Sequence, residues 1–291
     1  MKPDFIVIGT EKGGSTWLYD VLRAHPDVFL PDVKELHFFN RFDSNGQEID
    51  KFSRYGTEWY LEYFEGAEGH KAIGEATPLY LSDELAAERI QSVLPEARFI
   101  AVLRHPVDRF KSHYRMAKAK SHIDGTVRDT FRDHPVEFLE RGLYARHLRR
   151  WFDIFDQEQF LILTYDDLRD DPVSLLKTVA EWLGVDEGPL LAASPEDRRN
   201  AATGYRSARL YNTSVTLARA LRQNRVTANV AKWLKSIGVY QMLKSLNQTP
   251  AEHVDFGAED LEWLNEYYRQ DIAELRALLG VDYGWLEDRK T

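Results

Sequence analysis

The chain has 291 residues, of which 43% are hydrophobic, and a formal net charge of −9 at pH 7. This composition excludes a disordered chain, and the absence of cysteine excludes disulfide bonds and thiolate metal sites. The N-terminus shows no signal-peptide pattern, and no stretch approaches the ~18 apolar residues of a membrane span, so we expect a cytoplasmic protein.

Short apolar runs alternate with helical patterns along the first two thirds of the chain. In chain order, the predicted elements are a strand at Phe5–Ile8, a helix at Ser15–Ala24, a strand at Ala72–Gly74, a helix at Ser82–Leu94, a strand at Phe99–Leu103, helices at Val107–Ala119 and Gly142–Phe155, a strand at Phe160–Thr164 and a helix at Pro172–Leu183. Such alternation predicts an α/β fold, a parallel sheet flanked by helices. Later patterns are helical, notably Leu261–Leu279. We therefore predict one domain over residues 1–291, with an α/β core to residue 205 and a mainly helical C-terminal portion from residue 206.

A glycine-containing turn, Gly9 to Thr16, joins the first predicted strand to the first helix. It departs from the P-loop pattern G-x-x-x-x-G-K-[ST], because Ser15 stands at the lysine position and Lys12 lies between the glycines. At the carboxyl end of a strand, backbone amides and a helix N-terminus attract anions. The turn is therefore either a phosphate site or an ordinary strand-to-helix turn. The groups that favour a phosphate site are Gly13, Gly14 and the side chains of Lys12, Ser15 and Thr16.

A second phosphate-binding element is predicted at Arg104, directly after the strand Phe99–Leu103. Ser112 follows eight residues later, about two turns into the next predicted helix. An arginine at a strand end and a serine on the following helix can converge on one phosphate, for which the guanidinium supplies two parallel donors. Arg109 has an alternative role at the surface or in packing.

Together these two elements resemble the PAPS-dependent sulfotransferase superfamily, where PAPS is 3′-phosphoadenosine 5′-phosphosulfate. "KGGSTWL" is similar to its 5′-phosphosulfate loop, and "RHPVDRFKSHY" is similar to its 3′-phosphate motif, with His105 where Asp or Asn is commoner. "NAATGYRSARL" resembles the segment that closes over the 3′-phosphate, although a surface loop is an alternative. The resemblance implies PAPS as donor and PAP as product, bound by Lys12, Gly13, Gly14, Ser15, Thr16, Trp17, Arg104, Ser112, Gly204, Tyr205 and Arg206.

The resemblance also implies a P-loop-like sheet and metal-independent chemistry. The transferred sulfuryl group carries one charge fewer than a phosphoryl group, so protein cations and amides suffice to stabilise it. Lys12 would then neutralise the charge that grows on the leaving oxygen. No acidic residue ends the strand Phe99–Leu103 to complete a metal site, although Glu75 follows a weaker strand.

Two further segments resemble the carbohydrate branch, the heparan sulfate and glycosaminoglycan type. "PDVKELHFFN" is similar to the K-E-x-H-[FY]-F segment, which implies Glu35 as catalytic base, with an ion pair to Lys34 or Lys12 as the alternative role. "IGEATPLYL" is similar to G-E-K-[ST]-P-x-Y but has Ala76 where a lysine is common, which argues against a polyanionic glycan. The residues predicted to line the acceptor site are Lys34, His37, Glu75 and Thr77.

Three functions stay open on the sequence: a sulfotransferase, a P-loop-type nucleotide kinase or NTPase with a deviant loop, and a non-catalytic nucleotide-binding module. For the first, the acceptor is a hydroxyl or amine of a carbohydrate, a lipid-linked molecule or a small metabolite. The segment from Arg198 to Ala251 has ten Lys and Arg and no Asp or Glu. Residues 209–246 within it predict either weak peripheral membrane contact or a solvated face. Because this basic segment has no nucleic-acid-binding motif, we expect no nucleic-acid partner.

Overall fold

The computed structural model describes residues 1–44, 46–119, 123, 126–194, 203–205, 248–250, 254–281 and 283. At its centre lies a five-stranded sheet in the order β2-β3-β1-β4-β5, in which every neighbouring pair is parallel. The strands are β1 (Phe5–Gly9), β2 (Val28–Phe29), β3 (Ala72–Ala76), β4 (Arg98–Leu103) and β5 (Phe160–Thr164). The predicted α/β fold with a parallel sheet is confirmed. The sequence analysis missed β2, because two residues are too few to show a pattern.

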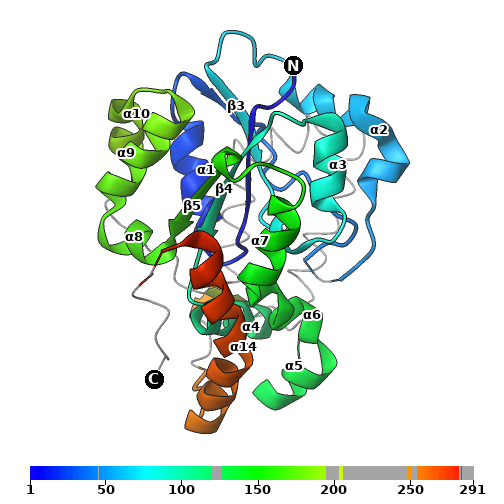
Figure 1. Cartoon of the computed structure of the whole chain (residues 1–291), viewed down its shortest axis with the longest axis vertical. Coiled ribbons are helices and arrows are strands. Elements are labelled where there is room, and N and C mark those ends of the chain that lie inside the picture. Colours follow the sequence, from blue (N-terminus) through cyan, green and yellow to red (C-terminus); the bar gives the residue numbers. More distant parts are fainter. Residues whose placement is uncertain are drawn as a thin grey trace.

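Helices cover both faces of the sheet (Figure 1). One face carries α1 (Ser15–Arg23), α8 (Tyr165–Asp170), α9 (Pro172–Leu183) and α10 (Glu187–Ala193), and the other carries α2 (Lys51–Leu61), α3 (Ala86–Val93) and α7 (Tyr144–Phe152). Within β1, Phe5 and Val7 pack into the first of these layers, whereas Ile6 and Ile8 pack into the second. This alternation follows from the two-residue period of a strand. The sheet is therefore buried on both faces, as its continuous apolar runs predict.

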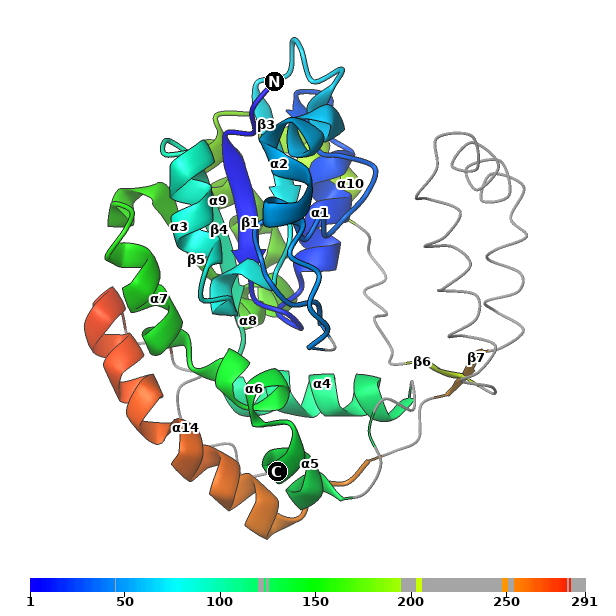
Figure 2. The ribbon, with the colours of Figure 1, turned by 90° about the vertical axis from the view of Figure 1, so that its right-hand side faces the viewer.

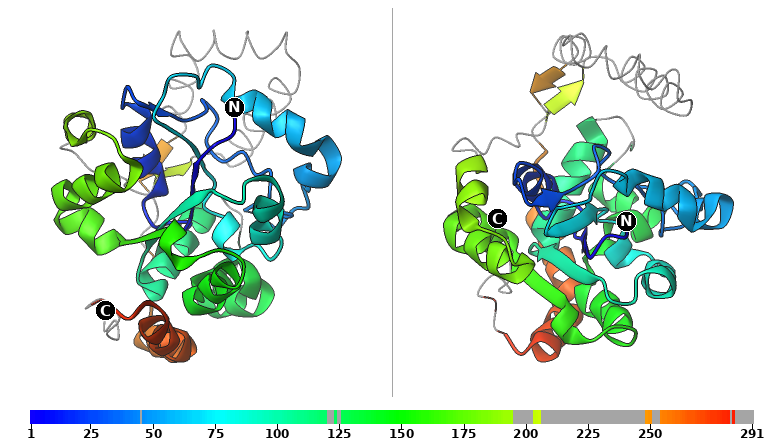
Figure 3. Two further views of the ribbon diagram at one scale, coloured as in Figure 1. Left: turned by 45° about the horizontal axis from the view of Figure 1, so that its top comes forward. Right: turned by 90° about the horizontal axis from the view of Figure 1, so that it is seen from above.

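A third layer lies beyond the carboxyl end of the sheet (Figure 2). It contains α4 (Pro106–Ala119), α5 (Val127–Asp133), α6 (Pro135–Phe138) and the C-terminal α14 (Ala258–Leu279), which share one hydrophobic cluster. α14 runs along α7 and α4 (Figure 3). Its Asp271 carboxylate accepts hydrogen bonds from the amides of Ala145 and Arg146 in the first turn of α7. The predicted C-terminal helix is thus confirmed, and it forms part of this third layer.

Two predicted helices begin later than the sequence pattern suggests. α3 begins at Ala86 rather than at residue 82, because the Asp83 carboxylate accepts from the amides of Leu85 and Ala86. α7 begins at Tyr144, because residues 140–142 form a short 3-10 turn. In both cases a local turn delays the start of the helix, although the apolar periodicity used to predict it begins earlier.

The basic segment lies largely outside the described residues. β6 (Thr203–Tyr205) pairs antiparallel with β7 (Gln248–Pro250), and β6 lies beside α4. Arg206 and residues 209–246 fall outside the described ranges, so the predicted membrane contact stays a prediction. Within the described ranges, every helix is too short or too polar to cross a membrane.

Candidate functional site

The turn after β1 is shaped by two glycines. A Cβ atom at Gly13 would lie 2.2 Å from the backbone oxygen of Val102, so only glycine fits beside β4. Gly14 precedes α1 with φ at 99°, a left-handed conformation that glycine adopts without strain. Because Gly14 has no side chain to cap α1, the first-turn amides and the positive end of the helix dipole face the turn. The turn can therefore hold an anion.

Arg104 joins the end of β4 to this turn. Its Nη1 donates to the backbone oxygen of Lys12 over 3.2 Å, and its guanidinium stacks 4.2 Å from the ring centre of Tyr165. Its Nε is buried and has no hydrogen-bond partner among the described residues. A buried donor of this kind is expected to pair, so it suits a ligand that accepts hydrogen bonds.

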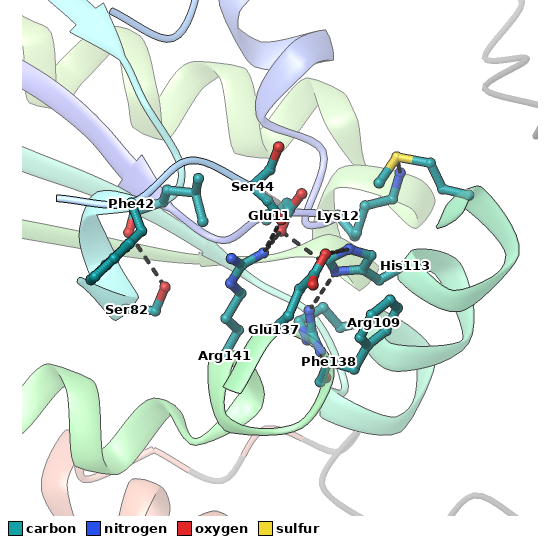
Figure 4. Close-up of polar contacts among 12 residues, drawn as sticks. Glu11, Lys12, Phe42, Ser44, Ser82, Arg109, His113, Glu137, Phe138 and Arg141 are labelled. Atoms are coloured by element: carbon teal, nitrogen blue, oxygen red, sulfur yellow. Dashed lines mark hydrogen bonds and ion pairs between the residues drawn. The ribbon is translucent and has the colours of Figure 1, made fainter. Parts of the chain in front are cut away.

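Helix α4 brings a second side chain to the turn. The Lys12 ammonium lies 3.4 Å from the Met116 sulfur (Figure 4). Ser112 precedes Met116 by one helical turn, so both side chains lie on the same side of α4. The structure thus places the two predicted phosphate-binding elements side by side, the turn that holds Lys12 and the pair formed by Arg104 and α4.

The other predicted donor-binding residues lie in different environments. Ser15 is buried, Thr16 is exposed at the start of α1, and the Trp17 indole packs in the core with 7% of its surface exposed. The contact with the donor that was predicted for Trp17 stays a prediction. Gly204 and Tyr205 lie on β6 beside α4, and Arg206 lies outside the described residues.

The sequence analysis missed a buried ionic cluster beneath Lys12 (Figure 4). The Glu11 carboxylate lies 2.9 Å from Arg141 Nη1 and 3.5 Å from His113 Nδ1. Burial alone would raise the pKa of Glu11, but nearby positive charge, including Arg141 and Arg109, lowers it to about 2. An acidic residue beside the lysine of a phosphate-binding turn was the available signal, because such a charge needs a compensating cation.

His113 sits at the centre of this cluster as a neutral imidazole. Burial lowers its pKa to about 3, against the attraction of Glu11. Its Nδ1 lies 3.4 Å from Arg109 Nη1 and 3.5 Å from the Glu11 carboxylate, and its Nε2 lies 3.8 Å from Glu137. Arg109 is completely buried and also donates to the backbone oxygen of Phe138. Of its two suggested roles, the structure supports packing.

The predicted base lies on the segment of residues 34–40, which we call the base segment. The Glu35 side chain is 41% exposed, its Oε1 accepts from Lys34, and its Oε2 lies 3.6 Å from His37 Nε2. The loss of water around the Glu35 carboxylate would by itself raise its pKa. His37 and Lys34 have a larger, opposite effect, so the net pKa of Glu35 is lowered to about 2. The suggested Lys34 ion pair is therefore present, and Glu35 is ionised at neutral pH.

The backbone is left-handed at three of the predicted site residues. Among described residues other than glycine, φ lies in the left-handed range at Lys12 (70°), Glu35 (64°) and His37 (51°). Such conformations are uncommon for residues with a Cβ atom and persist where the surrounding structure enforces them. All three residues were selected from the sequence, Lys12 from its place in the turn and Glu35 and His37 from the family resemblance.

Glu75 and Thr77 do not lie at an exposed site mouth. β3 continues through Glu75, whose side chain is 1% exposed, and Thr77 is completely buried. The Glu75 carboxylate accepts hydrogen bonds from Thr77 Oγ1 (2.8 Å), Tyr60 Oη (2.9 Å) and Tyr80 Oη (3.1 Å). Burial raises the pKa of Glu75 despite these three donors. The predicted acceptor contact of both residues is therefore corrected to an internal hydrogen-bond cluster.

Comparisons with known proteins agree with the geometry. The chain is 33% identical over 205 residues to a bifunctional heparan sulfate N-deacetylase/N-sulfotransferase 4 of Mus musculus, covering 63% of this chain and 22% of that protein. It is 31% identical over 191 residues to heparan sulfate glucosamine 3-O-sulfotransferase 3B1 of Homo sapiens, covering 63% of this chain and 46% of that protein. The chain thus spans less than half the length of both relatives.

A solved structure matches the whole fold. A sulfotransferase from Alicyclobacillus acidocaldarius superposes with a TM-score of 0.69 and 22% identity, over 99% of this chain and 100% of that chain. The family profile described as "Sulfotransferase domain" matches residues 2–197, which include the turn after β1, the base segment and Arg104. The chain therefore belongs to the sulfotransferase domain family.

Proposed function

We propose that this chain transfers a sulfuryl group from PAPS to a hydroxyl or amine of a carbohydrate acceptor, without a metal ion. The observation that supports it most strongly is the hydrogen bond from Arg104 to Lys12, which joins two candidate phosphate-binding elements at the carboxyl end of the sheet. Family membership points to the same reaction class.

The residues at this edge fit the donor. Bound PAPS supplies the sulfuryl group and presents two phosphate-bearing ends. The Lys12 ammonium and the first-turn amides of α1 would hold its 5′ end, and the unpaired Nε of Arg104 together with Ser112 would hold its 3′-phosphate. Lys12 can also stabilise negative charge on the leaving oxygen, an interaction that strengthens in the transition state.

Glu35 is assigned as the proton acceptor. Its ionised carboxylate is partly exposed, as a group must be that takes a proton from an acceptor hydroxyl. A carboxylate with a pKa of about 2 is a weak base, so we expect acceptor binding to displace Lys34 from Glu35 and raise that pKa. Lys34 and His37 would then orient the acceptor and the carboxylate.

Carbohydrate is favoured as the acceptor class because both relatives described above are named for heparan sulfate. The side chain at position 76 is a buried alanine, so this position gives no cation to a polyanionic glycan. We therefore favour a glycan of low charge. Lipid-linked and small-metabolite acceptors are alternatives that a direct assay separates.

The test is incubation of the full chain with radiolabelled PAPS and a panel of neutral glycans, heparan-type glycans, glycolipids and small alcohols or amines. We expect label on a glycan in the presence of a metal chelator, and no label with Glu35→Gln. In parallel, PAP should raise the melting temperature far more than ATP with magnesium. Equal shifts from the two nucleotides, or turnover that requires a metal, would overturn the proposal in favour of a nucleotide kinase or NTPase.

A further inference from the structure

Glu75 is the centre of a buried cluster of three hydroxyl groups. Tyr60 and Tyr80 both donate to its Oε1, from α2 and from the short 3-10 turn of residues 80–82, and Thr77 donates to its Oε2. A buried carboxylate is stable only when its lone pairs are satisfied, so the three donors and the carboxylate fix one another's orientation. No step of the proposed reaction uses this cluster directly.

Tyr80 links the cluster to the base segment. Its Oη donates to Glu75 and accepts from the backbone amides of Phe38 (3.0 Å) and, more weakly, Phe39 (3.4 Å). These two amides follow His37 directly. At the start of the left-handed stretch, the amide of Glu35 donates to the backbone oxygen of Ala76 over 2.9 Å. The end of β3 therefore anchors the base segment both before and after the two strained residues.

Aromatic packing reinforces the same anchor. The Phe38 ring stacks on Tyr60 with centroids 4.7 Å apart, and the Phe39 ring meets Tyr80 edge to face at 5.7 Å. The tyrosines that orient Glu75 through their hydroxyls thus hold the base segment through their rings. These contacts hold Glu35 and His37 in a left-handed conformation, which a chain without them would rarely adopt.

We propose that Glu75 is a positioning residue for the base. Acting through the Tyr80 hydroxyl, it holds Glu35 and His37 in the left-handed conformation that aims the Glu35 carboxylate at the acceptor. This inference rests on the proposed function, in which Glu35 takes the proton.

The two tyrosines provide a matched pair of variants. Tyr60→Phe and Tyr80→Phe each remove one hydroxyl from the same Glu75 oxygen, but only the Tyr80 hydroxyl also binds the base segment. We expect Tyr80→Phe to lower kcat about 10–100-fold, because a small misplacement of a catalytic group has effects of that size. We expect Tyr60→Phe to lower kcat less than threefold at a comparable loss of melting temperature. Glu75→Gln should resemble Tyr80→Phe, since a neutral amide accepts more weakly from Tyr80. PAP affinity should stay unchanged in all three.

A double-variant cycle identifies the route of the effect. The rates are measured with the panel acceptor that turns over fastest, for wild type, Tyr80→Phe, Glu35→Gln and the double variant. If Tyr80 acts through Glu35, the double variant should be no slower than Glu35→Gln alone. An equal kcat for Tyr60→Phe and Tyr80→Phe, or the same Tyr80→Phe loss in the Glu35→Gln background, would overturn the positioning role. A wild-type rate for Glu35→Gln would instead overturn the base assignment in the proposed function.

Discussion

The donor side of the site, the turn of residues 9–14 with Arg104, differs in construction from the base segment. The donor side is made of consecutive residues whose backbone amides and glycines form the candidate anion site, with one hydrogen bond from Arg104 to Lys12. The base segment depends on side chains about forty residues away, because Tyr80 binds the amides of Phe38 and Phe39. Local sequence therefore specifies the candidate phosphate-binding turn, whereas long-range packing places the candidate base.

The largest effect should come from the base segment. We expect Glu35→Gln to lower kcat by about 10²–10⁴-fold, the usual contribution of general base catalysis. PAP affinity should change less than about threefold, since Glu35 would contact the acceptor rather than the nucleotide. Steady-state rates and calorimetric PAP titrations measure the two quantities. If Glu35→Gln also lowered PAP affinity, Glu35 would contribute to donor binding, and the two regions would not have separate functions.

On the donor side, we expect Lys12→Met to lower kcat by about 10²–10³-fold, as for other donors that stabilise developing charge. Methionine keeps much of the side-chain length and the apolar contact with Met116, so the change isolates the ammonium charge. Single-turnover rates at saturating PAPS give the measurement, with Lys118→Met on the last turn of α4 as control. A Lys12→Met enzyme that differs only in KM would show that Lys12 binds the donor without assisting the reaction.

A smaller effect is expected at Arg104, where the proposed contact is to the non-reacting end of the donor. Arg104→Lys keeps the charge but loses the second parallel donor and the stacking on Tyr165. PAP affinity should fall about 10–100-fold, the range for hydrogen bonds between charged groups, while kcat at saturating PAPS stays near wild type. Arg132→Lys, at an exposed position on α5, is the control. Unchanged PAP affinity would remove Arg104 from the donor side.

The smallest effect concerns stability rather than turnover. The pKa of His113 is lowered by burial to about 3 in the folded state, against 6.5 as its ordinary value. The unfolded chain therefore takes up the proton first, so the stabilisation is complete above pH 6.5 and is lost as the pH falls toward 3. Between pH 7 and pH 5 the loss should be about 2 kcal/mol from this residue.

Denaturant unfolding at the two pH values measures that loss. The pKa of His147 on α7 is lowered by burial in the same way to about 3, so it should add a similar loss. His113→Gln should reduce the pH dependence by the His113 share and leave the His147 share. A wild-type slope in that variant would mean that the ionic cluster beneath the donor side does not hold His113 neutral.

The contrast between the two regions also explains what the sequence could reveal. The strand at Phe160–Thr164 and the helix at Pro172–Leu183 were predicted to the residue, because apolar periodicity and helix caps are local signals. Lys12 and Arg104 were selected from spacing alone, and they do lie together. Glu75 was misplaced, because its burial depends on hydroxyls from Tyr60 and Tyr80, and no local pattern shows that pairing. The Glu11–Arg141 contact was missed for the same reason, since it joins residues 130 positions apart.

The left-handed backbone at Lys12, Glu35 and His37 has a consequence for laboratory evolution of this enzyme. Glycine adopts that conformation without strain, so a glycine at any of these positions should make the fold tolerate heat slightly better. The same exchange deletes the ammonium, the carboxylate or the imidazole on which turnover is proposed to depend. A library screened for thermal survival alone would therefore enrich inactive variants at these three codons. A screen must therefore measure sulfuryl transfer as well as stability if it is to retain the three native side chains.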